Sequence, residues 1–377
     1  MLILDNDDIS KLLTMEDTIE ALRISNREIA EFRSQEEFTL NRPRTNCYLP
    51  WKGNEADTQR IFAAAAGNDT RVLYDFKSME GGSPHFGVWA VRSSSDLVRF
   101  TTGMYGPTYT YLRYGDLPGN KGYSDLIFLY NIHDAQFEAI LQSAILQRTR
   151  VAATSALGVD YLCPKSIKSL AMFGSGWQAA ANTRALCHVR PGINRVQVFS
   201  PNEDNRNAFA ERMRGEFGIE VVAMPSPEQA VRGMDLICEA TSARSPVFDG
   251  GLLQPGQHMV SIGGGDERFG RRPIDPRAVA RCAHVAAHSL EVRFGLEEIS
   301  DCIEEGKFKW DDVIDLPDLI SGRRRVAVAD GECTYFKNNV GLGSQFASVG
   351  GMVLQRAKER NIGFEVPQQK VAQFMRR

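Results

Sequence analysis

Residues Leu170–Leu186 read LAMFGSGWQAAANTRAL, and the fold of the chain is best worked out from this stretch. An apolar strand pattern ends at Phe173, glycines stand at Gly174 and Gly176, and a helical pattern then opens. The first glycine permits a tight turn, the second lets the backbone approach a pyrophosphate, and Ala179 allows the helix to pack closely on the strand. The N–H groups at the helix start are free to face phosphates. The stretch predicts either a dinucleotide-binding turn or a glycine-rich turn without a ligand.

The segments that follow alternate between strand and helix patterns. The expected strands, beginning near residue 166, are SIKSLAMFG, RVQVFS, IEVVAM, DLICEAT, HMVSIGGG and AHVAAHS. Strands that alternate with helices form parallel sheets with helices on both faces. This half of the chain is therefore predicted to be a Rossmann-type, doubly wound parallel sheet, and the context favours the dinucleotide over the empty turn.

The first 160 residues predict a smaller α+β domain. We expect an amphipathic helix over residues 10–32, strands over 71–77, 86–92 and 125–131, and a long helix over 134–160. Between them lies a segment, 101–122, that is rich in glycine, proline and tyrosine. It is either a surface excursion or a lid or pocket wall, since long loops in compact domains are usually functional.

The bulk composition is that of a soluble globular protein. Of its residues, 43% are hydrophobic and 24% are charged. The length of 377 residues suggests two domains. The net charge of −3 gives no general attraction to nucleic acid or to anionic membranes. The opening MLILDNDDISKLL has no signal-peptide pattern, and no apolar run reaches the ~18 residues of a membrane span.

The cysteines and histidines show no metal or disulfide pattern. The seven cysteines are odd in number and scattered, without a C-x-x-C pair, and the six histidines lack ligand spacing. We therefore expect no metal site and a reducing, cytoplasmic location.

The residues after the second strand bear on the choice of cofactor. Where an acid would grip the adenosine ribose, the chain has Ser200 and Asn202, and Arg206 is close enough to meet a 2′-phosphate. This favours NADP(H) over NAD(H). The alternative is that these residues only cap the following helix.

Several stretches stand in a distinctive order: RTRVAATSAL, FGSGWQA, EQAVRGMDLICEATSARSPVF, QPGQHMVSIGG and GECTYFK. Together with the opening helix they resemble the ornithine cyclodeaminase/μ-crystallin family, from about residue 3 to 357. The resemblance implies a substrate-binding and dimerisation domain (1–147 and 328–377) and a Rossmann dinucleotide-binding domain (148–327). It also implies that GECTYFK marks the return to the first domain.

The resemblance also implies site residues. Arg44, Lys77 and Arg150 would hold the carboxylate of an amino acid, and Lys77 with Asp266 would be catalytic. The cofactor contacts implied are Gly174, Ser175, Gly176, Trp177, Gln178, Ser200, Asn202, Arg206, Thr241, Ser242 and Gly264.

Simple chemistry agrees with these roles but leaves alternatives open. A guanidinium fork suits a carboxylate, and a lysine after bulky strand residues suits carboxylate binding or proton transfer. Arg44, Lys77 and Arg150 are otherwise ordinary surface charges, and Arg42 is a second candidate beside Arg44. Asp266 faces the edge where parallel sheets bind ligands, or is a turn aspartate.

The acid of the family stands about one residue earlier than Asp266, where this chain has Gly265. Either Asp266 or Glu267 substitutes for it, or the acid is absent.

Three functions remain open at this stage. The leading one is an NAD(P)-dependent oxidoreductase acting on the C–N bond of a small amino or imino acid, as an imine or ketimine reductase or an amino acid dehydrogenase. The second is a redox-neutral cyclodeaminase, and the third is a non-catalytic NADP-binding protein. The resemblance further implies a homodimer, with no nucleic-acid or membrane partner.

Overall fold

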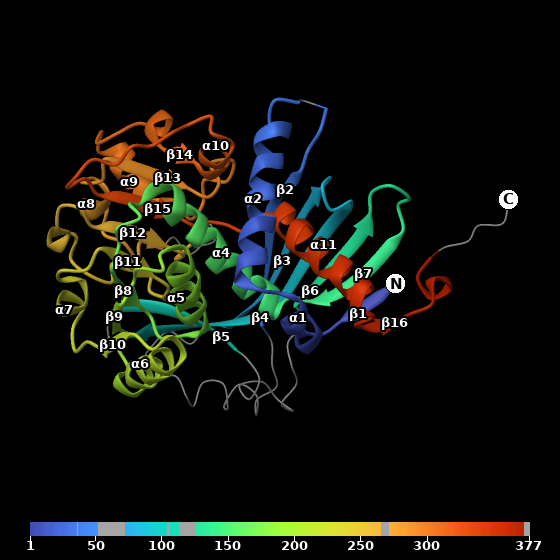
Figure 1. Cartoon of the computed structure of the whole chain (residues 1–377), viewed down its shortest axis with the longest axis horizontal. Coiled ribbons are helices and arrows are strands. Elements are labelled where there is room, and N and C mark those ends of the chain that lie inside the picture. Colours follow the sequence, from blue (N-terminus) through green and yellow to red (C-terminus); the bar gives the residue numbers. More distant parts are fainter. Residues whose placement is uncertain (36, 52–71, 104–105, 113–124, 265–270, 373–377) are drawn as a thin grey trace. The chain divides into compact units, whose positions relative to one another are not determined.

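The computed structural model describes the chain except for residues 36, 52–71, 104–105, 113–124, 265–270 and 373–377 (Figure 1). The chain divides into two compact units, each of which contains an eight-stranded sheet. Unit 1 comprises Met1–Thr101, Thr110–Arg150 and Gly341–Arg377, and unit 2 comprises Thr102–Tyr109 and Val151–Val340.

Unit 2 contains an entirely parallel sheet. Its strands are β8 (Ser169–Phe173), β9 (Arg195–Phe199), β10 (Glu220–Ala223), β11 (Leu236–Glu239), β12 (His258–Ser261), β13 (His284–Ala287), β14 (Ile314–Asp315) and β15 (Thr334–Lys337). Their order is β10-β9-β8-β11-β12-β15-β13-β14, and every adjacent pair is parallel. The first five strands follow the 3-2-1-4-5 order of a doubly wound fold. The predicted Rossmann-type α/β class is confirmed.

The helices of unit 2 begin and end at residues suited to capping. They are α5 (Trp177–Val189), α6 (Glu203–Phe217), α7 (Pro227–Val231), α8 (Pro276–Val279), α9 (Glu297–Glu304) and α10 (Leu316–Ser321), with 3₁₀ turns η2 (Gly250–Leu252) and η3 (Trp310–Asp312). For example, the Asn202 side chain accepts a bond from the Asn205 N–H at the start of α6, and Gly218 ends the helix with φ at +65°.

The chain returns to unit 1 later than the sequence suggested. GECTYFK was expected to open the return, but its residues Thr334–Lys337 form β15, fully buried between β12 and β13. The units divide at 150/151 and 340/341, rather than at 147/148 and 327/328. The reason is that a strand of four residues is too short to show a period that indicates which sheet it joins.

Unit 1 contains a mixed sheet. Its strands are β1 (Leu2–Leu4), β2 (Asn41–Pro50), β3 (Val72–Ser83), β4 (Val88–Gly103), β5 (Gly106–Tyr111), β6 (Asp125–Asn131), β7 (Phe137–Gln142) and β16 (Phe364–Glu365). The order is β16-β1-β7-β6-β4-β3-β2, with β5 paired to β4. Of these strands, residues 102–103 of β4 and 106–109 of β5 fall in unit 2. The pair β1–β7 is parallel, and β16–β1, β7–β6, β6–β4, β4–β3 and β3–β2 are antiparallel.

Two predicted helices of unit 1 are corrected by the structure. The expected helix over 10–32 is two helices, α1 (Asn6–Leu12) and α2 (Met15–Phe32), because the Thr14 side chain caps α2. The expected helix over 134–160 is the strand β7 followed by α4 (Ala144–Leu162). Residues 137–142 pair with β6 and β1, and this pairing overrides their local helical pattern.

The helix α11 (Gly343–Arg360) covers one face of the unit 1 sheet and also packs on α2, while the 3₁₀ turn η4 (Gln368–Lys370) follows near the end of the chain. Residues 343–354 of α11 are all buried. Gly343 is required for this packing, since a Cβ there would lie 1.9 Å from the carbonyl carbon of Glu80 in β3. The helix start therefore touches the strand backbone directly.

The strands of unit 1 bury charge and expose apolar groups. In β3, Asp75 and Lys77 are 1% and 5% exposed, whereas Phe76 between them is 38% exposed. The strand register places Leu49 and Tyr130, which are also exposed, on the side of Phe76. We call the side of Asp75 and Lys77 the polar face of this sheet, and the side of Phe76 its apolar face.

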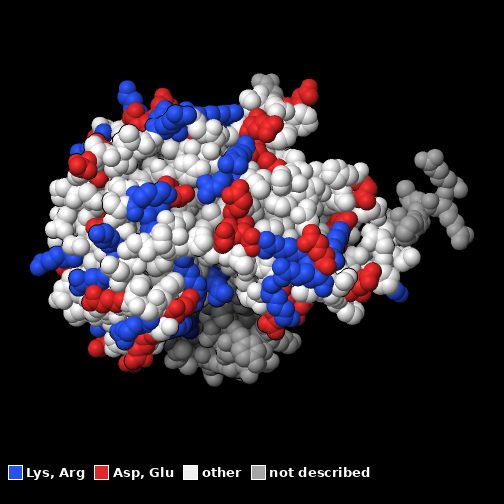
Figure 2. Space-filling view, viewed as in Figure 1, with Lys and Arg blue, Asp and Glu red and all other residues white. Residues whose placement is uncertain are grey.

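The outer surface is otherwise ordinary. Acidic and basic side chains are interspersed over the side of the molecule drawn in Figure 2. Over the described residues, no helix combines the length and apolar character that crossing a membrane takes. All seven cysteines are free thiols.

Candidate active site

Lys77 lies at the centre of the polar face of unit 1. Its Nζ is 2.6 Å from Asp75 Oδ2 and 3.6 Å from Asp96 Oδ2, and the Ser94 hydroxyl donates to Asp96 at 2.6 Å. Lys77 pairs with Ser94 and Asp75 with Asp96 across β3 and β4, so the four side chains form a square on one face. Two carboxylates this close favour the charged form of the lysine.

Arg92 lies next along β4 on the same face. It is 4% exposed and donates to Asp125 Oδ2 at 2.9 Å. Its guanidinium lies 5.7 Å from the centre of the Phe346 ring, and the guanidinium of Arg150 lies 5.0 Å from the same ring. One aromatic ring of α11 thus holds two arginines near each other.

Arg150 is almost fully buried, and neutral groups hold it. Its Nε and Nη2 donate to Gln147 Oε1 at 3.1 and 2.8 Å, and its Nη1 donates to Gln345 Oε1 at 3.0 Å. A Cβ at Gly341 would lie 2.6 Å from Arg150 Nη2. Burial first, and then repulsion from Arg92 and Arg44, lowers the pKa of Arg150 to about 9. The guanidinium is charged at neutral pH and is fixed in a place that favours an anion.

Arg44 in β2 completes the cluster. It is half-buried and its Nε donates to Asn46 Oδ1 at 2.9 Å, while Asn46 donates to the Tyr48 hydroxyl at 2.9 Å. Its charge acts on Arg150. The three residues predicted to hold a carboxylate therefore lie in one region of unit 1. Among the described side chains this region holds the cations Arg44, Lys77, Arg92 and Arg150 and the carboxylates Asp75, Asp96 and Asp125.

In unit 2, the glycine turn has the geometry that its sequence predicts. Gly174 has φ at +109°, and a Cβ there would lie 2.3 Å from the Ala240 carbonyl oxygen. Its N–H donates to Phe199 O at 2.8 Å, which ties the end of β8 to the end of β9. Glycine is required here by both conformation and space.

Gly176 is different, because nothing in the described part of the chain requires it. A Cβ there would meet no atom of the described residues within 4 Å, and its φ of −81° suits any residue. Gly176 caps α5 without a side-chain bond, so the first N–H groups of this helix point out of the fold, beside the 44% exposed Trp177. An open helix start beside a glycine fits a pyrophosphate.

The residues expected at the ribose end lie together at the end of β9. The hydroxyls of Ser175 and Ser200 are 2.9 Å apart. Arg206 donates to the carbonyls of Ser200 and Pro201 at 3.3 and 3.4 Å, and lies 3.6 Å from the carboxylate of Glu203. Asn202 has the capping role that was kept as an alternative.

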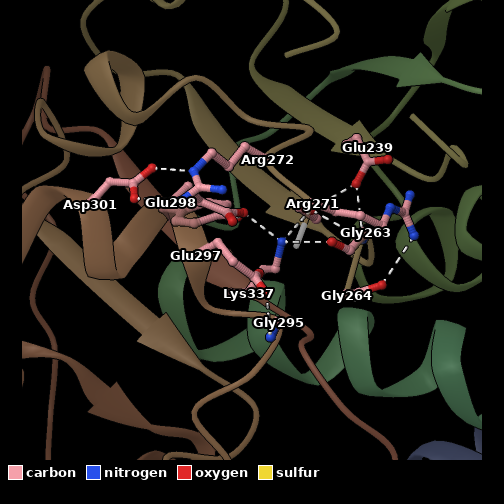
Figure 3. A network of polar contacts seen from close by, with 12 residues as sticks. Glu239, Gly263, Gly264, Arg271, Arg272, Gly295, Glu297, Glu298, Asp301 and Lys337 are labelled. Carbon is pink, nitrogen blue, oxygen red and sulfur yellow. Dashed lines mark hydrogen bonds and ion pairs between the residues drawn. The ribbon is translucent and has the colours of Figure 1, made fainter. Parts of the chain in front are cut away.

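The ends of β11 and β12 carry a buried polar network (Figure 3). Glu239, fully buried, accepts bonds from Thr241 and Gly263, and Gly264 accepts one from Arg271. Of the residues expected near the nicotinamide, Thr241 and Gly264 thus belong to one bonded network, while Ser242 is exposed. Gln178, also expected to contact the cofactor, is half-buried in the first turn of α5.

Lys337 lies beneath this network. It is fully buried, and its Nζ is 2.5 Å from Glu298 Oε1 and 3.0 Å from the Gly263 carbonyl oxygen. The Tyr335 hydroxyl also donates to Glu298, at 2.5 Å. Burial raises the pKa of Glu298 and of Tyr335.

The predicted acid Asp266 and the alternative Glu267 lie outside the described residues.

The sequence did not predict five residues of these sites: Asp75, Arg92, Asp96, Glu239 and Lys337. The available signal was the spacing of Arg92, Ser94 and Asp96 at every second residue of a strand. In the part of the chain that the structure describes, no three His, Cys, Asp or Glu side chains are placed to hold a metal ion.

The model of the ornithine cyclodeaminase/mu-crystallin family matches residues 119–361. The chain belongs to this family. A curated relative is the Delta(1)-pyrroline-2-carboxylate reductase of Bacillus cereus, which is 30% identical over 252 residues, 66% of this chain and 75% of the relative. The predicted family is therefore confirmed.

Two solved structures of similar proteins establish the fold of nearly the whole chain. The Thermococcus litoralis Delta(1)-pyrroline-2-carboxylate reductase, in complex with NADH and L-proline, has a TM-score of 0.75 at 23% identity and covers 97% of this chain and 100% of its own. An archaeal alanine dehydrogenase dimer with bound NAD has a TM-score of 0.75 at 20% identity, over 97% and 99% of the two chains.

Proposed function

We propose that the protein is an NAD(P)-dependent oxidoreductase that acts on the C–N bond of a small amino or imino acid, as an imine reductase or an amino acid dehydrogenase. The observation that carries the proposal is the buried cation cluster of unit 1 in a member of this family. The functions of the relatives support it, since one is a reductase of a cyclic imino acid and another is an amino acid dehydrogenase.

The cation cluster suits the carboxylate of the substrate. Buried like charges repel one another, as the lowered pKa of Arg150 indicates, and a bound carboxylate relieves that repulsion. Arg44 and Arg150 offer planar forks for bidentate contact, and their contacts to Asn46, Gln147 and Gln345 hold them in place. A carboxylate fixed in this way sets the geometry of the neighbouring carbon.

Lys77 is proposed as a catalytic cation of this face. Asp75 and Asp96 favour its ammonium form, and this is the form that binds a carboxylate or donates a proton. When an imine is reduced, its nitrogen takes up a proton, and Lys77 supplies a donor for it. Asp266 stays the alternative acid, as the sequence predicted.

Unit 2 is proposed to hold the nicotinamide dinucleotide. The open start of α5 after Gly174, Ser175 and Gly176 would hold the pyrophosphate, with Trp177 and Gln178 beside it. Thr241, Ser242 and Gly264 would contact the nicotinamide. When bound, this cofactor supplies or accepts the hydride.

NADP(H) is proposed over NAD(H), because Ser200 and Asn202 stand where an acid would exclude a 2′-phosphate and Arg206 lies beside them. Arg206→Ala should weaken NADPH about tenfold through one lost charged bond and leave NADH within about twofold. Fluorescence titration checks this. Tighter binding of NADH than NADPH by the unaltered protein contradicts the preference.

A homodimer through the apolar face of unit 1 is also proposed. Leu49, Phe76 and Tyr130 are exposed on this face, and a second copy of the chain would cover them. Light scattering should give twice the 41.9 kDa of the chain, and Phe76→Glu should shift the mass toward the monomer. Phe38→Glu, at an exposed phenylalanine off the sheet, is the control.

A cytoplasmic location is also proposed, and the free thiols of the seven cysteines support it.

The function is tested by absorbance at the reduced-cofactor band. We expect oxidation of NAD(P)H with a cyclic imino acid, or with a 2-oxo acid and ammonia. Ammonia release from ornithine without net absorbance change assigns a cyclodeaminase instead. Tight cofactor binding with no reaction of any substrate assigns a binding protein.

A further inference from the structure

Glu239 bonds to two separate loops at once. It ends β11 and is 0% exposed. Its Oε1 accepts from the N–H and hydroxyl of Thr241 at 2.8 and 2.7 Å, and its Oε2 accepts from the Ser261 hydroxyl at 2.7 Å and the Gly263 N–H at 3.0 Å. One carboxylate therefore organises the loop after β11 (240–243) and the loop after β12 (262–264).

Arg271 joins the same two loops through their carbonyl oxygens. It is 4% exposed, and it donates to Thr241 O at 2.6 Å, Ala243 O at 2.9 Å and Gly264 O at 3.1 Å. Figure 3 shows Glu239 and Arg271 beside Gly263, with a dashed line from Arg271 to Gly264. The N–H groups of the loops are thus held by an anion and their carbonyls by a cation.

The close packing around the loop after β12 requires glycine at two positions. A Cβ at Gly263 would lie 2.6 Å from Glu239 Oε2, and one at Gly264 would lie 2.2 Å from the Asn339 carbonyl oxygen. The loop after β12 is therefore wrapped directly onto the carboxylate and the neighbouring backbone.

The loop after β11 also contacts the glycine turn. The Ala240 N–H donates to Phe173 O at 2.9 Å, and the Ala240 carbonyl is the group that a Cβ at Gly174 would strike. Glu239 therefore sets the position of backbone that touches the proposed cofactor turn itself.

A buried carboxylate is costly unless several donors satisfy it. A small neutral residue would end a buried strand at lower cost, so the gain from Glu239 is the order of the loops. We propose that Glu239 is a positioning residue for hydride transfer: it fixes Thr241 and Gly264 where the nicotinamide of the proposed cofactor is held. This inference rests on the proposed function.

Glu239→Gln is the sharpest variant, because it keeps the size and removes the charge. Each carboxylate oxygen accepts from one backbone N–H, of Thr241 or of Gly263. Whichever way the amide turns, its NH₂ group faces one of these N–H groups and releases one loop. The variant changes no residue of α5 itself, whose first N–H groups would bind the pyrophosphate.

The matched control is Asp235→Asn, which makes the same chemical change at the other end of β11. Asp235 Oδ2 accepts from the N–H groups of Lys168 and Ser169 at 2.8 and 3.0 Å, at the amino end of the sheet. Both variants are assayed as the full chain at a temperature where circular dichroism shows them folded.

Glu239→Gln is expected to lower kcat about ten- to hundredfold, as misplacement of a reacting group does, with the dissociation constant of NADPH within about threefold. The kinetic isotope effect with cofactor deuterated at the transferred position should rise, because hydride transfer becomes slower than the other steps. Asp235→Asn should leave kcat and the isotope effect within about twofold.

Unchanged kcat and isotope effect in Glu239→Gln overturn the inference. Equal losses in the two variants also overturn it, since they indicate a general structural role. If the unaltered protein reduces no imino or oxo acid, the proposed function fails, and the role of Glu239 at the nicotinamide falls with it.

Discussion

Each unit of the protein buries one lysine against a carboxylate, and the two lysines differ in what surrounds them. Lys77 in unit 1 is 2.6 Å from Asp75, and Lys337 in unit 2 is 2.5 Å from Glu298. Around Lys77 stand three arginines, and one of them has a lowered pKa. Around Lys337 stand Glu298, a serine hydroxyl and a backbone carbonyl, all of which accept its protons.

Burial and ion pairing alone therefore do not distinguish a lysine that binds a ligand from a lysine that only stabilises the fold. The balance of positive and negative charge around the lysine distinguishes them. A surplus of cations favours an incoming anion, whereas the ammonium of Lys337 already meets three acceptors. The comparison predicts that substitution of Lys337 changes stability and that substitution of Lys77 changes turnover.

The largest expected effect is on stability, at Lys337. Lys337→Met removes the ammonium and leaves Glu298 buried without it, which costs about 3–5 kcal/mol in the free energy of unfolding. The measurement is urea unfolding of the full chain. Adding Glu298→Leu to Lys337→Met should recover part of the loss, because the uncompensated carboxylate is then gone. A loss below about 1 kcal/mol in the single variant contradicts a stabilising buried ion pair between Lys337 and Glu298.

The second effect is on turnover, at Lys77. Lys77→Met should raise the barrier or weaken substrate binding by about 2–5 kcal/mol, the cost of breaking a buried charge pair. NADPH affinity should stay within about twofold, because the proposed phosphate contacts belong to unit 2. The measurements are steady-state kinetics and fluorescence titration.

Lys11→Met, at a lysine whose side chain is 61% exposed in unit 1, is the control. If Lys77→Met turns over like this control, then the cation cluster is not a substrate site. If Lys77→Met instead lost stability as Lys337→Met does, the contrast between the two lysines would disappear.

The third effect is a pH dependence confined to unit 2. His258 is buried with its Nδ1 3.0 Å from the Thr334 hydroxyl, and burial lowers its pKa from 6.5 to about 4. The unfolded chain then binds a proton that the folded chain does not, so stability falls as pH drops from about 6.5 to 4, by about 3 kcal/mol in total. His258→Gln should flatten this part of the curve of unfolding free energy against pH. An unchanged slope in the variant assigns the acid sensitivity elsewhere.

The smallest effect concerns a partly exposed pair in unit 1. Arg356 donates to Asp17 at 2.6 Å, and this bond is the main cause that lowers the pKa of Asp17 to about 2. The pair stabilises the fold above pH ~3.8, and its contribution is lost as pH falls through about 2. Solvent screening limits it to about 0–1 kcal/mol in a double-mutant cycle of Arg356→Gln and Asp17→Asn at low salt. A value that is unaffected by 1 M salt contradicts a screened surface pair.

The glycine turn was predictable from the sequence because local conformation decides it. The backbone at position 174 has a positive φ next to a strand, and glycine is the residue that adopts a positive φ most readily. The six strands β8 to β13 of unit 2 were predictable from local sequence as well, since each carries several apolar residues and is bounded by turns. Thr334–Lys337 was predictable as a buried strand only by its composition, and its sheet was not.

The polar face of unit 1 was not predictable, since it reverses the usual rule for strands. In VLYDFKSM the aromatic side chains alternate with Asp75 and Lys77, which predicts buried aromatics and solvated charges. The structure buries the charges and exposes Phe76. The partners of Lys77 also depend on the register of β3 against β4, which no local pattern gives.

The path of the chain through the two sheets sets an order for folding during synthesis. Unit 2 takes nearly all its residues from one continuous stretch, Val151–Val340. Unit 1 begins with β1, yet it needs α11 to cover its sheet and β16 to pair with β1, and both come from the last forty residues. A growing chain therefore completes its second unit first. Meanwhile the first unit leaves the ribosome with the polar face of its sheet uncovered. It therefore depends on protection by chaperones for longer than the second unit does.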